Sequence, residues 1–128
     1  MSKRRLTEME YSKEHTCEVL REKVHNFRLQ KEQQLYPIFD QIMELESFIN
    51  GKMNEFERVG DEVIELQNSG APGHEIEWKR NQRDCLRNEL NALRDRKNIR
   101  EQELSQKRQE IDQQVQILLQ KLERGETF

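Results

Sequence analysis

The sequence has few of the residues that build an enclosed globular core. Hydrophobic residues make up 33% of its 128 positions and aromatic residues only 6%, whereas a compact domain needs closer to half apolar residues. No apolar run approaches the roughly 20 residues that a helix needs to cross a bilayer. The composition therefore argues against an ordinary globular core, and we expect no membrane insertion.

Turn-forming residues and cysteines are also scarce. The chain has five Gly and two Pro, and Glu, Lys, Arg, Gln and Leu form its bulk, which is typical of long helices and coiled coils. Its two cysteines, Cys17 and Cys85, do not make a secreted disulfide framework. The basic residues at 3–5 precede no apolar stretch of the kind found in signal peptides. We therefore expect an intracellular protein.

The boundary signals predict two helices in a single domain that covers residues 1–128. Thr7 and Glu10 fit a capping box at the start of the first helix. The only cluster of helix breakers lies at 68–73, where Gly70 suits a left-handed helix end. Gly125 suits the end of the second helix. We expect a helix over about 7–69, a turn over about 69–73 and a helix over about 74–124.

Pro37 conflicts with one continuous first helix. A proline inside a helix removes a hydrogen bond and clashes with the carbonyl four residues earlier. Either the first helix kinks at Pro37, or it is two helices placed end to end. We favour the kink, because the apolar pattern continues across the proline.

The first predicted helix carries an apolar stripe with the seven-residue repeat of coiled coils. From Leu35 one series repeats every seven residues and a second follows it three residues later, and nine of these ten positions are apolar. Lys52 is the exception. The predicted seam residues of this helix are Leu20, Val24, Phe27, Leu35, Ile38, Ile42, Leu45, Ile49, Phe56, Val59 and Val63.

The second predicted helix has a weaker stripe, which Lys97, Arg100 and Lys107 interrupt. Its predicted seam residues are Leu86, Leu90, Leu93, Leu104, Ile111, Val115, Leu118 and Leu122. When the chain is folded about the turn, facing positions add to about 142, and the register shift near Lys31 falls opposite the shift near Ile111. This coincidence predicts an all-α fold, a long antiparallel two-helix hairpin of coiled-coil type.

Several apolar residues lie on the flanks of these helices, where the seam cannot bury them. The predicted partner-binding residues are Tyr36, Phe39, Met43, Phe48, Met53, Trp78, Cys85, Ala92 and Ile99. Apolar patches of this kind mark association surfaces, so we expect partner helices to complete a three- or four-helix bundle. The alternative is that these are isolated surface residues, which need no explanation.

Charge patterning supports the hairpin in a coarser way. Residues 40–65 contain eight acidic and two basic residues, whereas residues 79–108 contain ten basic and five acidic ones. The two stretches face each other in the hairpin, and Glu46 with Arg94 is the clearest expected pair. The basic residues within the seam favour a heteromeric partner that offers carboxylates, over a homomeric one.

No arrangement of residues in the sequence points to catalysis. There are three histidines and no paired-cysteine motif, phosphate-binding loop or nucleophile elbow. We predict no catalytic residues, no cofactor and no metal site, and we do not expect an enzyme.

These observations favour a structural or adaptor subunit that binds other coiled-coil proteins, either cytoplasmic (in a cytoskeletal or trafficking complex) or nuclear. The alternative is a helical protein associated with nucleic acid, because a basic stripe is the usual electrostatic signature of that function. The stripe comprises Lys79, Arg80, Arg83, Arg87, Arg94, Arg96, Lys97 and Arg100. Interspersed acidic residues and few aromatics disfavour this alternative, and the same acidic residues disfavour a membrane-surface helix.

Overall fold

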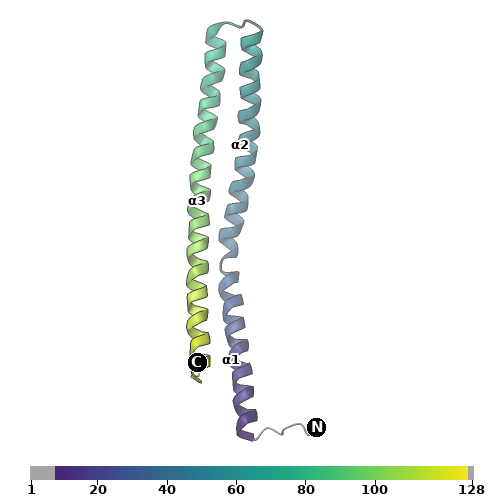
Figure 1. Ribbon diagram of the computed structural model, residues 1–128. Helices are drawn as coiled ribbons and strands as arrows, with labels where there is room; N and C mark the ends of the chain where they lie inside the picture. Colours follow the sequence, from purple (N-terminus) through teal and green to yellow (C-terminus); the bar gives the residue numbers. More distant parts are fainter. Residues whose placement is uncertain (1–7, 127–128) are drawn as a thin grey trace. The chain divides into compact units, whose positions relative to one another are not determined.

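The computed structural model describes residues 8–126, with side chains from residue 13 onward. Within this range the chain is helical and contains no strand. Its elements are α1 (Glu8–Gln33), α2 (Tyr36–Asn68) and α3 (Gly73–Glu123) (Figure 1). The predicted capping box at Thr7 lies outside the described residues.

The described chain divides into two compact units. In unit 2, which covers Pro37–Leu104, α2 and the first part of α3 run side by side in opposite directions and are joined by a short turn. Unit 1 contains α1 and the last part of α3, from Ser105 onward, which also lie side by side. Each unit is thus one layer of two packed helices.

The turn between α2 and α3 is closed by glycine in the left-handed conformation. Gly70 has a φ of 69°, which an L side chain adopts only with strain. The backbone N–H of Gly70 donates to the carbonyl of Gln67, and that of Ala71 donates to the carbonyl of Leu66. These two bonds form a Schellman motif, which satisfies carbonyls that the helix end leaves free. Gly125, with a φ of 73°, ends α3 in the same way.

The first predicted helix is interrupted just before Pro37. α1 ends at Gln33 and α2 begins at Tyr36, so Pro37 lies in the first turn of α2. A proline is tolerated there because its missing N–H would have no helical acceptor. Between the helices, the N–H groups of Gln34 and Leu35 donate to carbonyls only three residues earlier.

The buried side chains form one stripe in each unit. In unit 2 they are Ile38, Ile42, Ile49, Val59, Val63, Leu86, Leu90 and Leu104. In unit 1 they are Leu20, Val24, Leu35, Ile111 and Val115. Val59 is the most enclosed, at 0% exposure. Burial of an aliphatic side chain contributes about 1.5–3 kcal/mol, so these stripes hold the paired helices together.

Candidate protein-interaction surfaces

Ion pairs between α2 and α3 align the two helices of unit 2. Lys52 Nζ lies 2.9 Å from a carboxylate oxygen of Glu89, and Lys97 Nζ lies 3.2 Å from one of Glu46. The hydrogen bond to Glu89 raises the pKa of Lys52 above its ordinary 10.5. The hydrogen bond to Glu46 raises that of Lys97 in the same way. These exposed pairs contribute little stability because solvent screens them, but they favour one register between the helices.

The expected pairing of Glu46 with Arg94 is wrong. Glu46 accepts from Lys97, whereas the Arg94 guanidinium donates to the sulfur of Met53, at 3.5 Å. Lys97 lies nearly one helical turn beyond Arg94, and its flexible stem reaches across the interface.

Two of the three basic seam residues, Lys97 and Arg100, lie beside carboxylates of their own chain. Lys97 pairs with Glu46 and Glu101, and Arg100 bonds to Glu103 at 2.7 Å. These two cations are therefore partly neutralised within the chain.

The nine predicted partner-binding residues are all exposed to solvent. Among the large side chains of this set, the most exposed are Trp78 at 65%, Met43 at 63% and Ile99 at 61%. Tyr36 belongs to unit 1 and the other eight belong to unit 2. The two-helix layer therefore leaves large apolar side chains in contact with water, which is the condition that an association surface requires.

In unit 2 these residues lie on two different sides of the helix pair. Phe48 and Ile99 line one groove between α2 and α3, whose floor includes Leu45 and Leu93; we call this the Phe48 groove. Met53 lines a second groove together with Phe56, Leu90, Arg87 and Arg94. The two grooves share no lining residue. At 100° per residue, Phe48 and Met53 fall on opposite flanks of the buried stripe of α2.

A third apolar hollow lies beside the turn of unit 2 and contains Trp78. Leu66, His74 and Lys79 are among the residues that line it, and the Lys79 ammonium lies 5.4 Å from the centre of the indole ring. Lys79 also donates to Glu62, and this hydrogen bond holds the pKa of that carboxyl below its ordinary 4.5. The indole face is thus partly covered by a cation whose charge is already neutralised.

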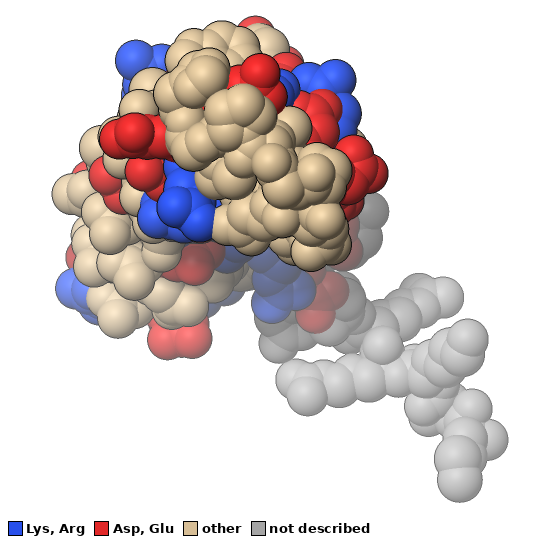
Figure 2. All heavy atoms as spheres, turned by 90° about the horizontal axis from the view of Figure 1, so that it is seen from above, with Lys and Arg blue, Asp and Glu red and all other residues tan. Residues whose placement is uncertain are grey.

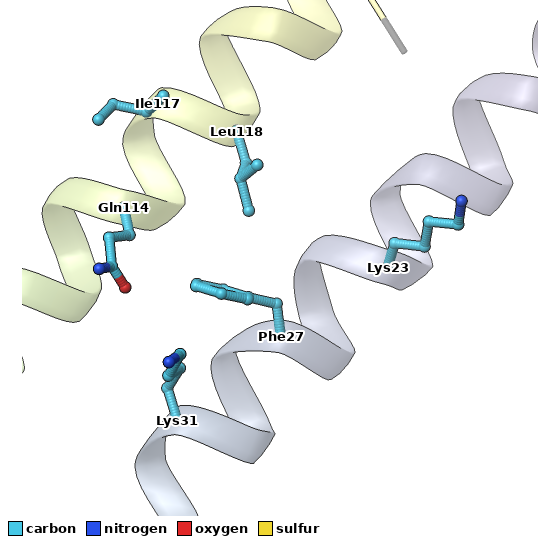
Figure 3. A pocket seen from close by; sticks show the side chains of 6 residues that line it. All are labelled: Lys23, Phe27, Lys31, Gln114, Ile117 and Leu118. Carbon is cyan, nitrogen blue, oxygen red and sulfur yellow. The ribbon is translucent and has the colours of Figure 1, made fainter. Parts of the chain in front are cut away.

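Unit 1 has a groove of its own between α1 and α3 (Figure 3). The ring of Phe27 reaches from α1 toward Leu118 and Gln114 of α3. The Lys31 ammonium lies 5.7 Å from the centre of that ring, and Lys23 also lines the groove. The floor is apolar and its charged lining residues are both cationic.

Six of the predicted seam residues are half-buried and the other thirteen are buried. The half-buried residues are Phe27, Leu45, Phe56, Leu93, Leu118 and Leu122. All of them except Leu122 line one of the grooves. A pair of helices covers these positions from one side only, so the grooves are places where a further helix could complete their burial.

Several exposed apolar residues were not predicted from the sequence. Ile64 is 55% exposed and Ile117 is 52% exposed. Helical spacing could have located Ile64, because it follows Met53 by eleven residues, or about three turns. Arg96 lies at the Phe48 groove, but the sequence alone did not separate it from the other residues of the basic stripe.

Four of the eight residues of the basic stripe of α3 lie beside carboxylates in the folded chain. Lys79, Lys97 and Arg100 pair with carboxylates as described, and Arg87 lies 3.7 Å from a carboxylate oxygen of Asp84. Figure 2, which views the turn end, shows acidic and basic side chains side by side among other residues. This pattern differs from the continuous basic field that nucleic acid favours.

The described part of the chain contains neither a metal-binding cluster nor a membrane-spanning helix. Between residues 13 and 126, no cluster of three or more His, Cys, Asp or Glu side chains is arranged to hold a metal ion. No helix in this range combines the length and the apolar content needed to cross a membrane. Cys17 and Cys85 are both free thiols.

Comparisons of the chain with protein-family models, with curated proteins and with solved structures give no match.

Proposed function

We propose that this chain is a non-enzymatic structural or adaptor subunit, which assembles with other proteins by packing its helices against theirs. The observation that carries the proposal is the exposure of large apolar side chains along helices that already bury one stripe. Trp78, Met43 and Ile99 are each more than 60% exposed. Ordered exposed apolar stripes on helices are covered by further helices in bundles.

The geometry of unit 2 adds a second argument. Its exposed apolar residues border grooves on two sides of the helix pair. A third helix on one side, or one helix on each side, would bury the half-covered seam residues and extend the bundle to three or four helices. Ridges of one helix fit such grooves at an interaxial distance of about 8–10 Å.

Purification of the tagged chain from its native source tests the proposal. We expect it to come with other helical proteins, and we expect the double change Phe39→Glu with Met43→Glu to release at least one of them. Both side chains lie on the outside of α2, so far-ultraviolet circular dichroism should show an intact helical fold. A charge added to a packed apolar surface would cost several kcal/mol of association energy.

A matched control adds the same two charges without removing apolar surface. Ser47 and Asn54 are exposed residues of α2, and Ser47→Glu with Asn54→Glu should leave the complex intact. The proposal is wrong if the tagged wild-type chain is recovered alone and sedimentation shows it to be a folded monomer.

A further inference from the structure

The Phe48 groove combines an apolar floor with a basic edge, and this combination restricts what can fill it. The groove encloses about 720 Å³. Its floor is formed by Leu45 and Leu93, which are half-buried, and its walls by Phe48 and Ile99, which are 55% and 61% exposed. An occupant must therefore present apolar side chains in order to displace water from this surface.

The edge formed by α3 carries unbalanced positive charge. Arg96 and Arg100 both line the groove and stand one helical turn apart, a spacing at which like charges repel. Arg100 bonds to Glu103, whereas Arg96 forms no ion pair with any residue in the described part of the chain. The edge formed by α2 is mixed, because it carries Glu44 together with Lys52, and Lys52 already pairs with Glu89.

We propose that the Phe48 groove binds an amphipathic α-helix of a partner protein, whose apolar stripe is bordered by Asp or Glu on the edge that faces Arg96 and Arg100. This inference rests on the proposed function and specifies the partner. The groove extends from Gln41 to Lys52 along α2, which is ~17 Å or about three helical turns. A segment of this length supplies two or three apolar anchors, as in other helix-in-groove complexes.

The chemistry of the groove favours a helix over the other kinds of occupant. Nucleic acid binds through phosphates and would leave the apolar floor wet, and a lipid surface is too flat to enter between two helices. The groove of unit 1 has the same chemistry, with Phe27 and Leu118 at its floor and Lys23 and Lys31 around it. Carboxylates beside an apolar stripe complement both grooves.

The test uses two synthetic helical peptides of about 21 residues, or three heptads. Both carry the same Leu and Ile stripe with Gln along one edge; along the other edge, one peptide has Glu and the other has Lys. Binding to the full chain is measured by fluorescence anisotropy at low salt, at peptide concentrations where sedimentation shows the peptides to be monomeric. We expect the Glu peptide to bind at least tenfold more tightly than the Lys peptide.

Charge reversal on the chain distinguishes this groove from other surfaces. Arg96→Glu should weaken binding of the Glu peptide at least tenfold and strengthen binding of the Lys peptide. This variant should remain folded, because the new carboxylate would stand one turn before Arg100, at a favourable spacing. Arg94→Glu is the matched control, because Arg94 lines the second groove of unit 2, the one that contains Met53. It should change the affinity for either peptide less than twofold. Phe48→Ser should weaken both peptides.

Four results would overturn the inference. One is that the two peptides bind with equal affinity. Another is that Arg94→Glu and Arg96→Glu change the affinity for the Glu peptide equally. The third is a wild-type chain that dimerises by itself and becomes monomeric on Phe48→Ser, which would place a second copy in the groove. If the peptides bind but respond only to Phe39→Glu with Met43→Glu, the groove is wrong and the proposed function survives. Loss of the native complex is judged separately by the purification described above.

Discussion

Replacing Ile49 by aspartate should unfold much of unit 2, whereas the same replacement at Ile99 should not. Both residues are isoleucines in helices of one unit, but Ile49 is 8% exposed and Ile99 is 61% exposed. At Ile49 the change forfeits about 1.5–3 kcal/mol of apolar burial. It also places a carboxylate in the packed interface, and burying that charge without a partner costs several kcal/mol more.

The expected loss at Ile49 is therefore at least ~4 kcal/mol, out of a total stability on the order of 5–15 kcal/mol. At Ile99 the expected change in the isolated chain is within about 0.5 kcal/mol, as for other surface substitutions. The difference should appear as a fall in melting temperature of ~10 °C or more for Ile49→Asp. Thermal and urea unfolding followed by far-ultraviolet circular dichroism measures both quantities.

The pair of variants also separates packing within the chain from packing against a partner. Ile99→Asp should melt like the wild-type chain and yet lose affinity for the Glu peptide, because Ile99 is a wall of the Phe48 groove. If the free energy of unfolding of Ile49→Asp is within about 1 kcal/mol of the wild-type value, the register between α2 and α3 is wrong.

Three further predictions test the backbone, the electrostatics and the pairing of unit 1. Gly51→Ala should stabilise the chain by about 0.5–1 kcal/mol, because an added Cβ meets nothing within 4 Å and glycine is a poor helix former. Gly70→Ala should destabilise the chain by about 1 kcal/mol, because φ is 69° there. Urea unfolding in which Gly51→Ala and Gly70→Ala shift the free energy of unfolding in the same direction would contradict this pair of predictions. The pKa of Glu62 in the folded chain lies below the ordinary 4.5. The ionised carboxylate therefore stabilises the fold above pH 4.5, and this stabilisation is lost as the pH falls through the folded pKa. Acid unfolding of Glu62→Gln should lack this component, and an unchanged pH profile would count against the Lys79 hydrogen bond. Spin labels can be attached through Lys23→Cys and Ile117→Cys after serine replaces both native cysteines. The two labels should lie within ~20 Å of each other, because packed helix axes are about 8–10 Å apart. A separation close to the length of α3 would refute the pairing of α1 with α3.

Much of the local structure could be predicted from spacing and turn chemistry. A seven-residue repeat places Ile42, Ile49 and Val63 on one side of a helix whatever else the chain does. Gly70 and Gly125 are the residues that helix ends with positive φ require. These features depend on interactions within a few residues, so the order of amino acids is enough to determine them.

The break between α1 and α2 shows a limit of such reasoning. Pro37 made a kink and a split equally compatible with local chemistry, and the continuing apolar pattern favoured the kink. The structure ends α1 at Gln33 and restarts the helix at Tyr36. Leu35 lies in the intervening turn and is nevertheless buried, so an apolar repeat can continue across residues that are not helical.

The sequence by itself determined which residues form the stripes, and the tertiary structure decided which stripes share a surface. Phe48 and Ile99 come from different helices, and only the rotation of each helix about its axis brings them to one groove while Met53 turns to another. The partner of Lys97 was decided in the same way, by the reach of a flexible side chain across the interface. Rotation and reach depend on how all the buried side chains pack at once, and no short stretch of sequence contains that information.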